Sequence, residues 1–523
     1  MTAQALGAAA LAAMLTDGQE AALIDLREEL DFSRHHLLQA RSVPLSRLEL
    51  LIAPLVPRRS TRLVLCDGGE GLSARAAAIL ARFGYGNLFW LDATDRECEA
   101  ADLLSFSGVN VPSKAFGECV EHDRHTPGID AAELDALIRQ GRDLVVLDSR
   151  PFDEYERMSI PTAINVPGAE LVLRIHDIAP SPATMVVVNC AGRTRSIIGA
   201  QSLIDAGVLN RVAALRNGTM GWELAGLACE RGKARRAPPV SPAGLAWAKA
   251  AAARVADACG VARIDRATLE RWQGDSQRTL YLFDVRDPAE YAAGHVAGAR
   301  SAPGGQLVQG TDHYIGTLNA RIVLVDDAEA RALMTASWLR RMGWKDVYIL
   351  AESGRDTAAP ATPILGGAVA AAQLLDPVAL AALLARNAAT VVDLASSREY
   401  RRFHIPGAWF AIRARLARAL PKIAPKGLLV LTSEDGRLAA LAAEEAGALA
   451  TVPVRVLAGG NAAWAQAGHP VTADTPRLAD EPVDLWLKPY ERAGGKAAME
   501  EYLSWEVELL DRIGRDRSCG FRV

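Results

Sequence analysis

Residues 186–196 of the chain read VVVNCAGRTRS, and residues 197–203 continue as IIGAQSL. The β-branched apolar run predicts a buried strand, and the apolar spacing after Ser196 predicts a helix that ends near Gly207. Cys190 therefore begins a strand-to-helix loop. Backbone N–H groups and the positive end of the helix dipole face such a loop, so this position favours an anion.

Cys190 is expected to be a reactive thiolate. Helix N-termini and nearby cations favour the thiolate form of cysteine, and Arg193 and Arg195 add two permanent cations to this loop. The alternative is a buried structural cysteine, which is the usual role of a lone Cys in an apolar strand. The glycine and the two arginines favour the reactive interpretation. The predicted substrate-binding loop consists of Ala191, Gly192, Arg193, Thr194, Arg195 and Ser196.

An apolar strand that ends in aspartate recurs along the chain. The four strand ends are Asp25, Asp148, Asp284 and Asp393. The step from Asp148 to Cys190 is 42 residues. The same step in the first and third repeats leads to Asp67 and Asp326, and the equivalent place in the fourth repeat is Thr432 or Ser433. Only the second repeat therefore carries a cysteine at this position, and a carboxylate in the other loops is expected to accept the loop N–H bonds.

Cys66 lies close to the equivalent position in the first repeat but aligns with Asn189, one residue too early. Neighbouring strand residues point to opposite faces, so Cys66 is expected to face away from the loop. Its own loop carries Glu70 where the second repeat carries arginine. Acidic neighbours raise the pKa of a thiol, which disfavours a role for Cys66 in catalysis.

A second motif follows the aspartate strand in three repeats. It pairs Glu-Tyr with a downstream Pro or Gly-His element, as in Glu154-Tyr155, Glu290-Tyr291 with Gly294-His295, and Glu399-Tyr400 with His404-Ile405-Pro406-Gly407-Ala408. Together with the CAGRTR loop, this pattern resembles the rhodanese sulfurtransferases, in which a six-residue loop beginning with the nucleophilic Cys cradles a persulfide sulfur. The resemblance covers the chain from about Gly7 to Thr472. It implies four tandem rhodanese-like α/β domains, each a mainly parallel sheet flanked by helices, followed by a helical C-terminal tail.

The repeats divide the chain into five parts. The expected boundaries are 1–120, 121–235, 236–358 and 359–475 for the rhodanese-like domains, and 476–523 for the tail. Ligands of such folds bind at the carboxyl ends of the strands, where Cys190 falls. The tail is expected to pack against a neighbouring domain or a second subunit. In two-domain rhodaneses the inactive half covers the active half, so the first repeat is the expected cover.

The resemblance also implies an activity. Cys190 would take a sulfane sulfur from an anionic donor such as thiosulfate and pass it, through a persulfide, to cyanide or a thiol, without a metal or organic cofactor. Asp148 and Arg150 match the family's paired positions and are expected to brace the loop. The open alternatives are 3-mercaptopyruvate as donor, a phosphatase-like enzyme, and a non-catalytic persulfide carrier or docking scaffold. Related phosphatases need arginine at the position of Ser196, so the loop length favours sulfur.

Composition limits the remaining possibilities. The net charge of −4 and the pI near 6.2 give no support for binding to nucleic acid or to membranes. No uninterrupted apolar stretch reaches the length of a membrane span. The seven cysteines are sparse and form no CxxC pair, which suggests a reducing, cytoplasmic location. A homodimer is possible, because residues 476–523 have no counterpart among the repeats and could pack against a second subunit.

Overall fold

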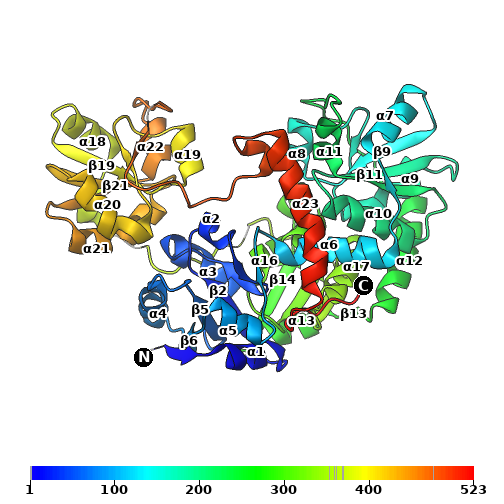
Figure 1. The fold of residues 1–523 in the computed structure, drawn as a ribbon, viewed down its shortest axis with the longest axis horizontal. Helices are drawn as coiled ribbons and strands as arrows, with labels where there is room; N and C mark the ends of the chain where they lie inside the picture. The colour runs from blue at the N-terminus through cyan, green and yellow to red at the C-terminus, as the bar shows by residue number, and fades with distance from the viewer. Residues whose placement is uncertain (1–2, 353, 359, 361, 368–369, 475) are drawn as a thin grey trace.

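The computed structural model describes residues 3–352, 354–358, 360, 362–367, 370–474 and 476–523. Within this part of the chain the main strands form four sheets, three with five strands and one with six, and every pairing in them is parallel. Helices flank each sheet (Figure 1). The predicted fold of four tandem α/β domains with a helical C-terminal tail is confirmed.

The first domain has the strand order β1-β6-β5-β2-β4. Its strands are β1 (Gln4–Leu6), β2 (Ala21–Asp25), β4 (Ala40–Ser42), β5 (Arg62–Cys66) and β6 (Leu88–Leu91). Its helices are α1 (Ala8–Thr16), α2 (Glu29–Phe32), α3 (Leu48–Leu55), α4 (Leu72–Arg82) and α5 (Asp95–Ala100). A small antiparallel ribbon pairs β3 (His36–Leu37) with β7 (Ser105–Phe106), and α6 (Val111–Arg124) leads into the second domain.

The second domain has the order β10-β9-β11-β12-β8. Its strands are β8 (Gly128–Ile129), β9 (Leu144–Asp148), β10 (Ile164–Asn165), β11 (Met185–Asn189) and β12 (Val212–Leu215). Its helices are α7 (Ala131–Arg139), α8 (Phe152–Arg157), α9 (Glu170–Ile178), α10 (Thr194–Ala206) and α11 (Gly218–Leu224). Strand β11 is central and buried along its whole length, so Cys190 follows the carboxyl end of a central strand, as predicted.

The third domain has the order β13-β17-β16-β14-β15. Its strands are β13 (Ala262–Arg263), β14 (Leu280–Asp284), β15 (Arg300–Ser301), β16 (Arg321–Val325) and β17 (Val347–Leu350). Its helices are α12 (Pro242–Ala258), α13 (Arg266–Gln273), α14 (Pro288–Ala293), α15 (Gly304–Gln309), α16 (Thr311–Tyr314) and α17 (Ala330–Arg341). Helix α12 begins where the Ser241 side chain accepts from the Gly244 N–H, with Pro242 in the first turn.

The fourth domain has the order β18-β22-β21-β19-β20-β23. Its strands are β18 (Leu374–Leu375), β19 (Ala389–Asp393), β20 (Trp409–Phe410), β21 (Leu428–Thr432), β22 (Val454–Leu457) and β23 (Arg477–Leu478). Its helices are α18 (Pro377–Leu384), α19 (Ser397–Arg402), α20 (Leu416–Ile423), α21 (Arg437–Leu449) and α22 (Gly460–Gln466). Strand β23 belongs to the stretch that the sequence analysis assigns to the tail, so the tail begins by extending this sheet.

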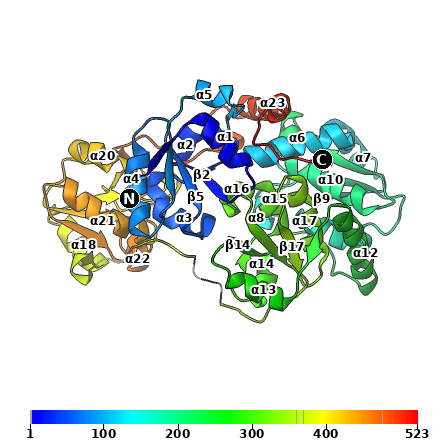
Figure 2. The ribbon, with the colours of Figure 1, turned by 90° about the horizontal axis from the view of Figure 1, so that it is seen from below.

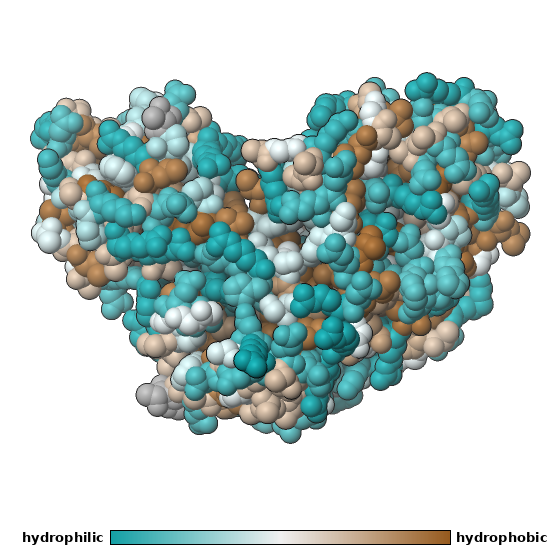
Figure 3. Space-filling view, viewed as in Figure 1, coloured by the Kyte–Doolittle hydropathy of each residue, from teal (hydrophilic) through white to brown (hydrophobic). Residues whose placement is uncertain are grey.

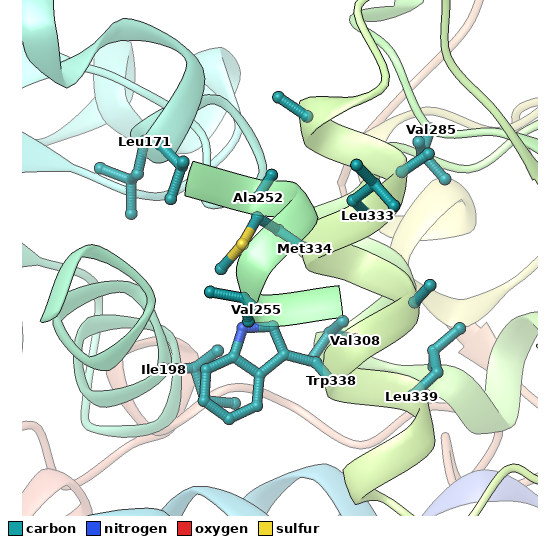
Figure 4. Close-up of a cluster of buried hydrophobic side chains, with 14 of the residues drawn as sticks. Leu171, Ile198, Ala252, Val255, Val285, Val308, Leu333, Met334, Trp338 and Leu339 are labelled. Carbon is teal, nitrogen blue, oxygen red and sulfur yellow. The ribbon is translucent and has the colours of Figure 1, made fainter. Parts of the chain in front are cut away.

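The second and third domains share one hydrophobic core. Helices α9 and α10 of the second domain pack against α12 and α17 of the third, with Trp338 and Met334 between them (Figure 4). The Trp338 indole N–H donates to the Ser202 hydroxyl across this junction at 2.8 Å. A continuous core of this kind fixes the two domains relative to each other. Side chains of the third domain can therefore form part of a site in the second.

The tail leaves the fourth domain and crosses to the second, where α23 (Lys496–Ile513) lies along α6 (Figure 1). The fourth domain lies at one end of the molecule, away from the paired second and third domains (Figure 2). A notch separates its lobe from that of the second domain on the face shown in Figure 3. The prediction that the tail packs against a neighbouring domain is confirmed. No helix in the described ranges is long and apolar enough to span a membrane.

Candidate active site

The loop that begins at Cys190 is held by its carbonyl groups. The Cys190 carbonyl accepts from the Thr219 N–H at 2.9 Å, and the Ala191 carbonyl accepts from the Met220 N–H at 3.0 Å. Both donors lie in the first turn of α11. Within the described chain, the N–H groups of residues 191–195 find no hydrogen-bond acceptor. These groups are therefore free to bind an anion at the N-terminus of α10.

Gly218 allows this close contact between the loop and α11. Its φ angle is +54°, and a Cβ atom added there would lie 2.3 Å from the Cys190 carbonyl oxygen. Only glycine combines this backbone conformation with such a close approach. The Asn217-Gly218 pair is therefore part of the scaffold that shapes the loop.

The Cys190 side chain is buried, with 2% of the residue exposed. Its thiol lies 3.5 Å from the Ser196 hydroxyl, which itself donates to the Arg193 carbonyl at 2.7 Å. The Thr194 hydroxyl is buried in the same loop and has no partner among the described residues. The loop thus combines a thiol, a hydroxyl group that contacts it and a set of free N–H groups.

Arg193 is bound by carboxylates of α6. Its guanidinium donates to both oxygens of Glu118, at 2.8 and 2.7 Å, and also to Glu121. Burial disfavours the arginine charge, but the two carboxylates outweigh it and raise the pKa of Arg193. The charge of Arg193 is therefore compensated before any substrate binds.

Arg195 is bound in the same way by Glu154 of α8. The closest contact joins Nη2 of Arg195 to Oε2 of Glu154 at 2.9 Å, and Nη1 lies 3.4 Å from the Gln306 side chain of the third domain. Lys488 of the tail approaches the other Glu154 oxygen at 3.8 Å. Burial alone would raise the pKa of the Glu154 carboxyl, but Arg195, Lys488 and Arg150 outweigh it and lower the pKa to about 2.

The charges around the loop balance. Four cations face four carboxylates: Arg193, Arg195, Lys488 and Lys114 face Glu118, Glu121, Glu154 and Glu506. The sequence analysis expected the two arginines to supply an excess of positive charge, and the structure differs because their partners come from α6 and α8. The free N–H groups and the dipole of α10 therefore contribute more to anion binding than net charge does.

Glu154 gives the domain a specific acid sensitivity. An unfolded glutamate has a pKa of about 4.3, whereas the pKa of Glu154 in the folded protein is about 2. The ionised Glu154 carboxylate therefore stabilises the fold fully above about pH 4.3, and this stabilisation is lost as the pH falls toward 2. We expect Glu154→Gln to lower the melting temperature at about pH 7 and to lose most of this effect at about pH 2. Thermal unfolding at both pH values measures it.

Glu156→Gln serves as the matched control for this prediction, because Glu156 lies on the same helix but is exposed. It is expected to change the melting temperature little at either pH. An effect of Glu154→Gln that is independent of pH would contradict the assigned role of the carboxylate.

Asp148 and Arg150 lie behind the loop and do not touch the Cys190 thiol. The Asp148 carboxylate accepts from Arg150 Nε at 2.9 Å and Nη2 at 2.7 Å, and from the Asn189 side chain at 3.0 Å. Asn189 immediately precedes Cys190, and all three side chains are buried. The pair is thus positioned to brace the end of β11, as expected from the resemblance.

The equivalent loops of the first and third domains are filled by their own aspartates. Asp67 accepts from the N–H groups of Gly69 and Ser73 at 2.9 and 2.8 Å. Asp326 accepts from the N–H groups of three residues, at 3.1, 2.8 and 3.2 Å, which are Ala328, Arg331 and Ala332. Gly69 and Ala328 are the counterparts of Gly192, and Arg331 is the counterpart of Arg195. The aspartates therefore bind N–H groups whose counterparts at Gly192 and Arg195 remain free around Cys190.

The fourth domain places Ser433, and not Thr432, at the position of Cys190. Strand β21 ends at Thr432, and the Ser433 carbonyl accepts from the Asn461 N–H at 2.8 Å, the counterpart of the bond between Cys190 and Thr219. The Ser433 hydroxyl accepts from the Ala439 N–H at 3.3 Å. The step from Asp393 to this position is therefore 40 residues, two fewer than in the other domains.

Cys66 is the last residue of β5 and is buried. Burial and the neighbouring Asp25 carboxylate raise the pKa of the Cys66 thiol well above its ordinary value, against a smaller opposing effect of Arg27. A thiol in this state is a poor nucleophile. The environment of Cys66 therefore disfavours its thiolate form.

Cys190 opens into a cavity of about 310 Å³ that several parts of the chain line. The loop forms its floor, and residues 109–114, 306–314 and 486–502 form its walls. The sequence analysis missed the side chains that these walls contribute, which include Lys114, Gln306, Gln309, His313, Tyr314, Trp486, Lys488, Tyr490 and Tyr502. None of them belongs to a repeated motif, so no signal in the sequence marked them.

The expectation that the first repeat covers the active loop is wrong. It contributes only residues 109–114, at the start of α6, whereas the third domain and the tail form most of the cover. The shared core with the third domain places residues 306–314 over the loop. The packing of α23 on α6 brings the tail to the same place, through the buried pair of Lys114 and Glu506 at 2.8 Å.

Comparison with known proteins agrees with this architecture. The rhodanese-like domain family matches residues 7–93, 130–225, 265–355 and 376–467. The crystal structure of a thiosulfate sulfurtransferase from Pseudomonas aeruginosa is 46% identical, covers 99% of each chain and superposes with a TM-score of 0.96. A rhodanese-related protein from Thermoplasma volcanium is 27% identical over 20% of this chain and 97% of its own, with a TM-score of 0.18. No curated protein matches. The chain belongs to the rhodanese family and carries four rhodanese-like domains in tandem.

Proposed function

We propose that this chain is a thiosulfate sulfurtransferase whose single reactive centre is Cys190. The observation that carries the proposal is the contrast between the loops. The Gly192 and Arg195 N–H groups beside Cys190 are free, whereas Asp67 accepts from the Gly69 N–H and Asp326 accepts from the Ala328 and Arg331 N–H groups at the same positions. The similarity to a thiosulfate sulfurtransferase along almost the whole chain supports the same donor.

The reaction has two steps at one sulfur atom. The Cys190 thiolate attacks the sulfane sulfur of thiosulfate, an S–S bond forms to Cys190, and the S–S bond of thiosulfate breaks with its electron pair leaving on sulfite. Cyanide or a thiolate then attacks the outer sulfur of the persulfide, and the Cys190 thiolate is released. Electrons balance in each step, so no external oxidant or reductant is required.

The loop stabilises the charges that appear during these steps. The free N–H groups of residues 191–195 are proposed to bind the outer persulfide sulfur, together with the Thr194 hydroxyl, which has no partner among the described residues. The Ser196 hydroxyl lies within reach of the Cys190 sulfur. Arg195, which is held by Glu154 and lines the cavity, is proposed to orient the sulfonate group of the donor.

The acceptor is proposed to be small. The cavity of about 310 Å³ is at the lower end of the range for small-molecule sites, and the third domain and tail form most of its walls. Cys190 is 2% exposed at its floor, which disfavours a folded protein as acceptor. Cyanide and low-molecular-weight thiols fit without such a change.

The test is thiocyanate production from cyanide with thiosulfate and with 3-mercaptopyruvate as donors. We expect the larger kcat/KM with thiosulfate and no hydrolysis of an aryl phosphate. A higher kcat/KM with 3-mercaptopyruvate would replace the proposed donor. Phosphatase activity without thiocyanate production would contradict the proposed reaction class.

Lys488 is expected to help the anionic donor enter the cavity. Its ammonium group lies at the rim, partly exposed, 3.8 Å from Glu154. Removing one such charge is worth about 1 kcal/mol, so Lys488→Ala should raise the KM for thiosulfate by about fivefold and leave kcat nearly unchanged. Steady-state kinetics at low and high salt measure this effect, which should shrink as salt increases.

Lys496→Ala is the matched control, because Lys496 is exposed on the same tail and does not line the cavity. Its KM for thiosulfate is expected to equal that of the wild type. A fall in kcat without a change in KM for Lys488→Ala would show that Lys488 acts in the chemistry and not in donor entry.

A further inference from the structure

A second and larger cavity lies at the far end of the tail. Its volume is about 890 Å³, and it shares no lining residue with the cavity at Cys190. The ends of α1 and α17 and the strand β4 form its walls together with residues 517–523. In Figure 1 the C-terminus lies beside α6 and α17, at this place. Four parts of the chain that are distant in sequence therefore meet around one cavity.

The charged side chains that line this cavity are all cationic. They are Arg41, Arg124, Arg340, Arg341, Lys345, Arg517 and Arg522, and no aspartate or glutamate is among the lining residues. Asp205 is the only carboxylate in the described part of the chain that pairs with any of them, and it is shared by Arg124 at 2.9 Å and Arg341 at 2.7 Å. The balance of charge seen at the catalytic loop is absent here, which leaves a strongly positive cavity.

Arg41 shows that this positive charge is not confined to mobile surface side chains. It is 2% exposed and lies in strand β4. Its guanidinium donates to the carbonyls of Ile315 and Gln39, both at 3.0 Å, and makes no ion pair within the described ranges. The Asp312 carboxylate lies near enough to stabilise the Arg41 charge, but it offsets only part of the burial that lowers the pKa of Arg41. A bound anion would provide a direct partner for this guanidinium.

The cavity also has an apolar side. Leu15, Leu318, Met342, Trp344 and Phe521 line it together with the cations. Small-molecule sites commonly combine an apolar lining with a few charged groups, in volumes of about 300–1,000 Å³. A simple inorganic anion would use the cations and leave this apolar surface uncovered. The lining fits an organic anion better.

We propose that this cavity binds a small organic ligand that carries two or more phosphate groups on an aromatic or apolar body, as a nucleoside diphosphate does. Arginine forks match phosphate oxygens in a bidentate manner, and several of them around one cavity match a chain of phosphates. The aromatic body of the ligand lies against Trp344 and Phe521. The proposal is independent of the sulfur chemistry at Cys190.

Isothermal titration calorimetry of the full chain with ADP, pyrophosphate and adenosine tests the proposal. We expect saturable binding of one ADP per chain, weaker binding of pyrophosphate and no binding of adenosine. Arg517→Ala/Arg522→Ala should weaken ADP binding by about tenfold or more, because both side chains are exposed and can be removed without disturbing the fold.

Arg139→Ala is the control, since Arg139 is an exposed arginine that pairs with Asp135 on α7, outside the cavity. It should bind ADP as the wild type does. Absence of saturable ADP binding would overturn the proposal, and so would equal weakening by Arg139→Ala. Competition between ADP and thiosulfate would also overturn it, because it would place ADP at Cys190. If pyrophosphate bound as tightly as ADP, the proposed contact of an aromatic body with Trp344 and Phe521 would be contradicted.

Discussion

Cys190→Ser is expected to lower thiocyanate production by at least about 1,000-fold, because the serine hydroxyl cannot take the sulfane sulfur from thiosulfate at neutral pH. The fold should be unaffected, since serine is close in size to cysteine and Ser433 occupies the equivalent position in the fourth domain. Steady-state assays with thiosulfate and cyanide, together with thermal unfolding of both proteins, measure the two expectations.

Cys66→Ser is the matched control for the nucleophile. Cys66 is also buried, but it is the last residue of its central strand, whereas Cys190 follows one. Its thiol has a raised pKa and precedes a loop that holds Asp67. Its substitution should leave kcat close to the wild-type value. Activity that survives in Cys190→Ser and is lost in Cys66→Ser would contradict the alignment of the repeats on which the assignment of Cys190 depends.

Asp148→Ala is expected to have the next largest effect, on both stability and activity. It leaves the buried Arg150 guanidinium without its carboxylate and removes the acceptor of the Asn189 side chain. Breaking a buried ion pair costs about 3–5 kcal/mol of unfolding free energy. Because Asn189 holds the start of the Cys190 loop, kcat should also fall by about 100-fold through misplacement of the loop.

Asp25→Ala separates these two effects. Asp25 and Arg27 form the same buried pair in the first domain, at 2.6 Å, behind a loop that holds no nucleophile. Its substitution should lower the melting temperature of its domain and leave kcat of the folded protein unchanged. Thermal unfolding and kinetics below the melting transition compare the two variants. If Asp25→Ala and Asp148→Ala lost kcat to the same extent, Asp148 would act only through the stability of the whole protein.

The repeated motif made much of the site predictable from the sequence. Aspartate-ended strands and a constant 42-residue step placed Cys190 after a central strand and identified Asp67 and Asp326 as its inert counterparts. These features are local, since a strand and the helix after it determine the loop between them. In the fourth repeat the sequence does not distinguish Thr432 from Ser433 as the equivalent of Cys190, because the two-residue shortening can lie anywhere between Asp393 and the loop. The structure assigns the position to Ser433.

Charge compensation and the cover of the site depend on contacts between distant segments. Glu118 lies 75 residues from Arg193 in the chain, and their pairing follows from how α6 packs across α10. Gln306 reaches the cavity because α12 and α17 pack the third domain against the second. Lys488 reaches it because the tail returns to α6. A single sequence contains no periodicity that encodes such long-range packing, so these parts of the site were not predicted.

The intact mass of the wild-type protein before and after thiosulfate, and again after cyanide, tests directly whether Cys190 carries the sulfur. We expect a gain of one sulfur atom per chain, located on the peptide that contains Cys190 and removed by cyanide. Cys190→Ser should show no gain. A wild-type protein that makes thiocyanate without ever gaining sulfur, or that gains it on another cysteine, would contradict the central claim that Cys190 carries the persulfide.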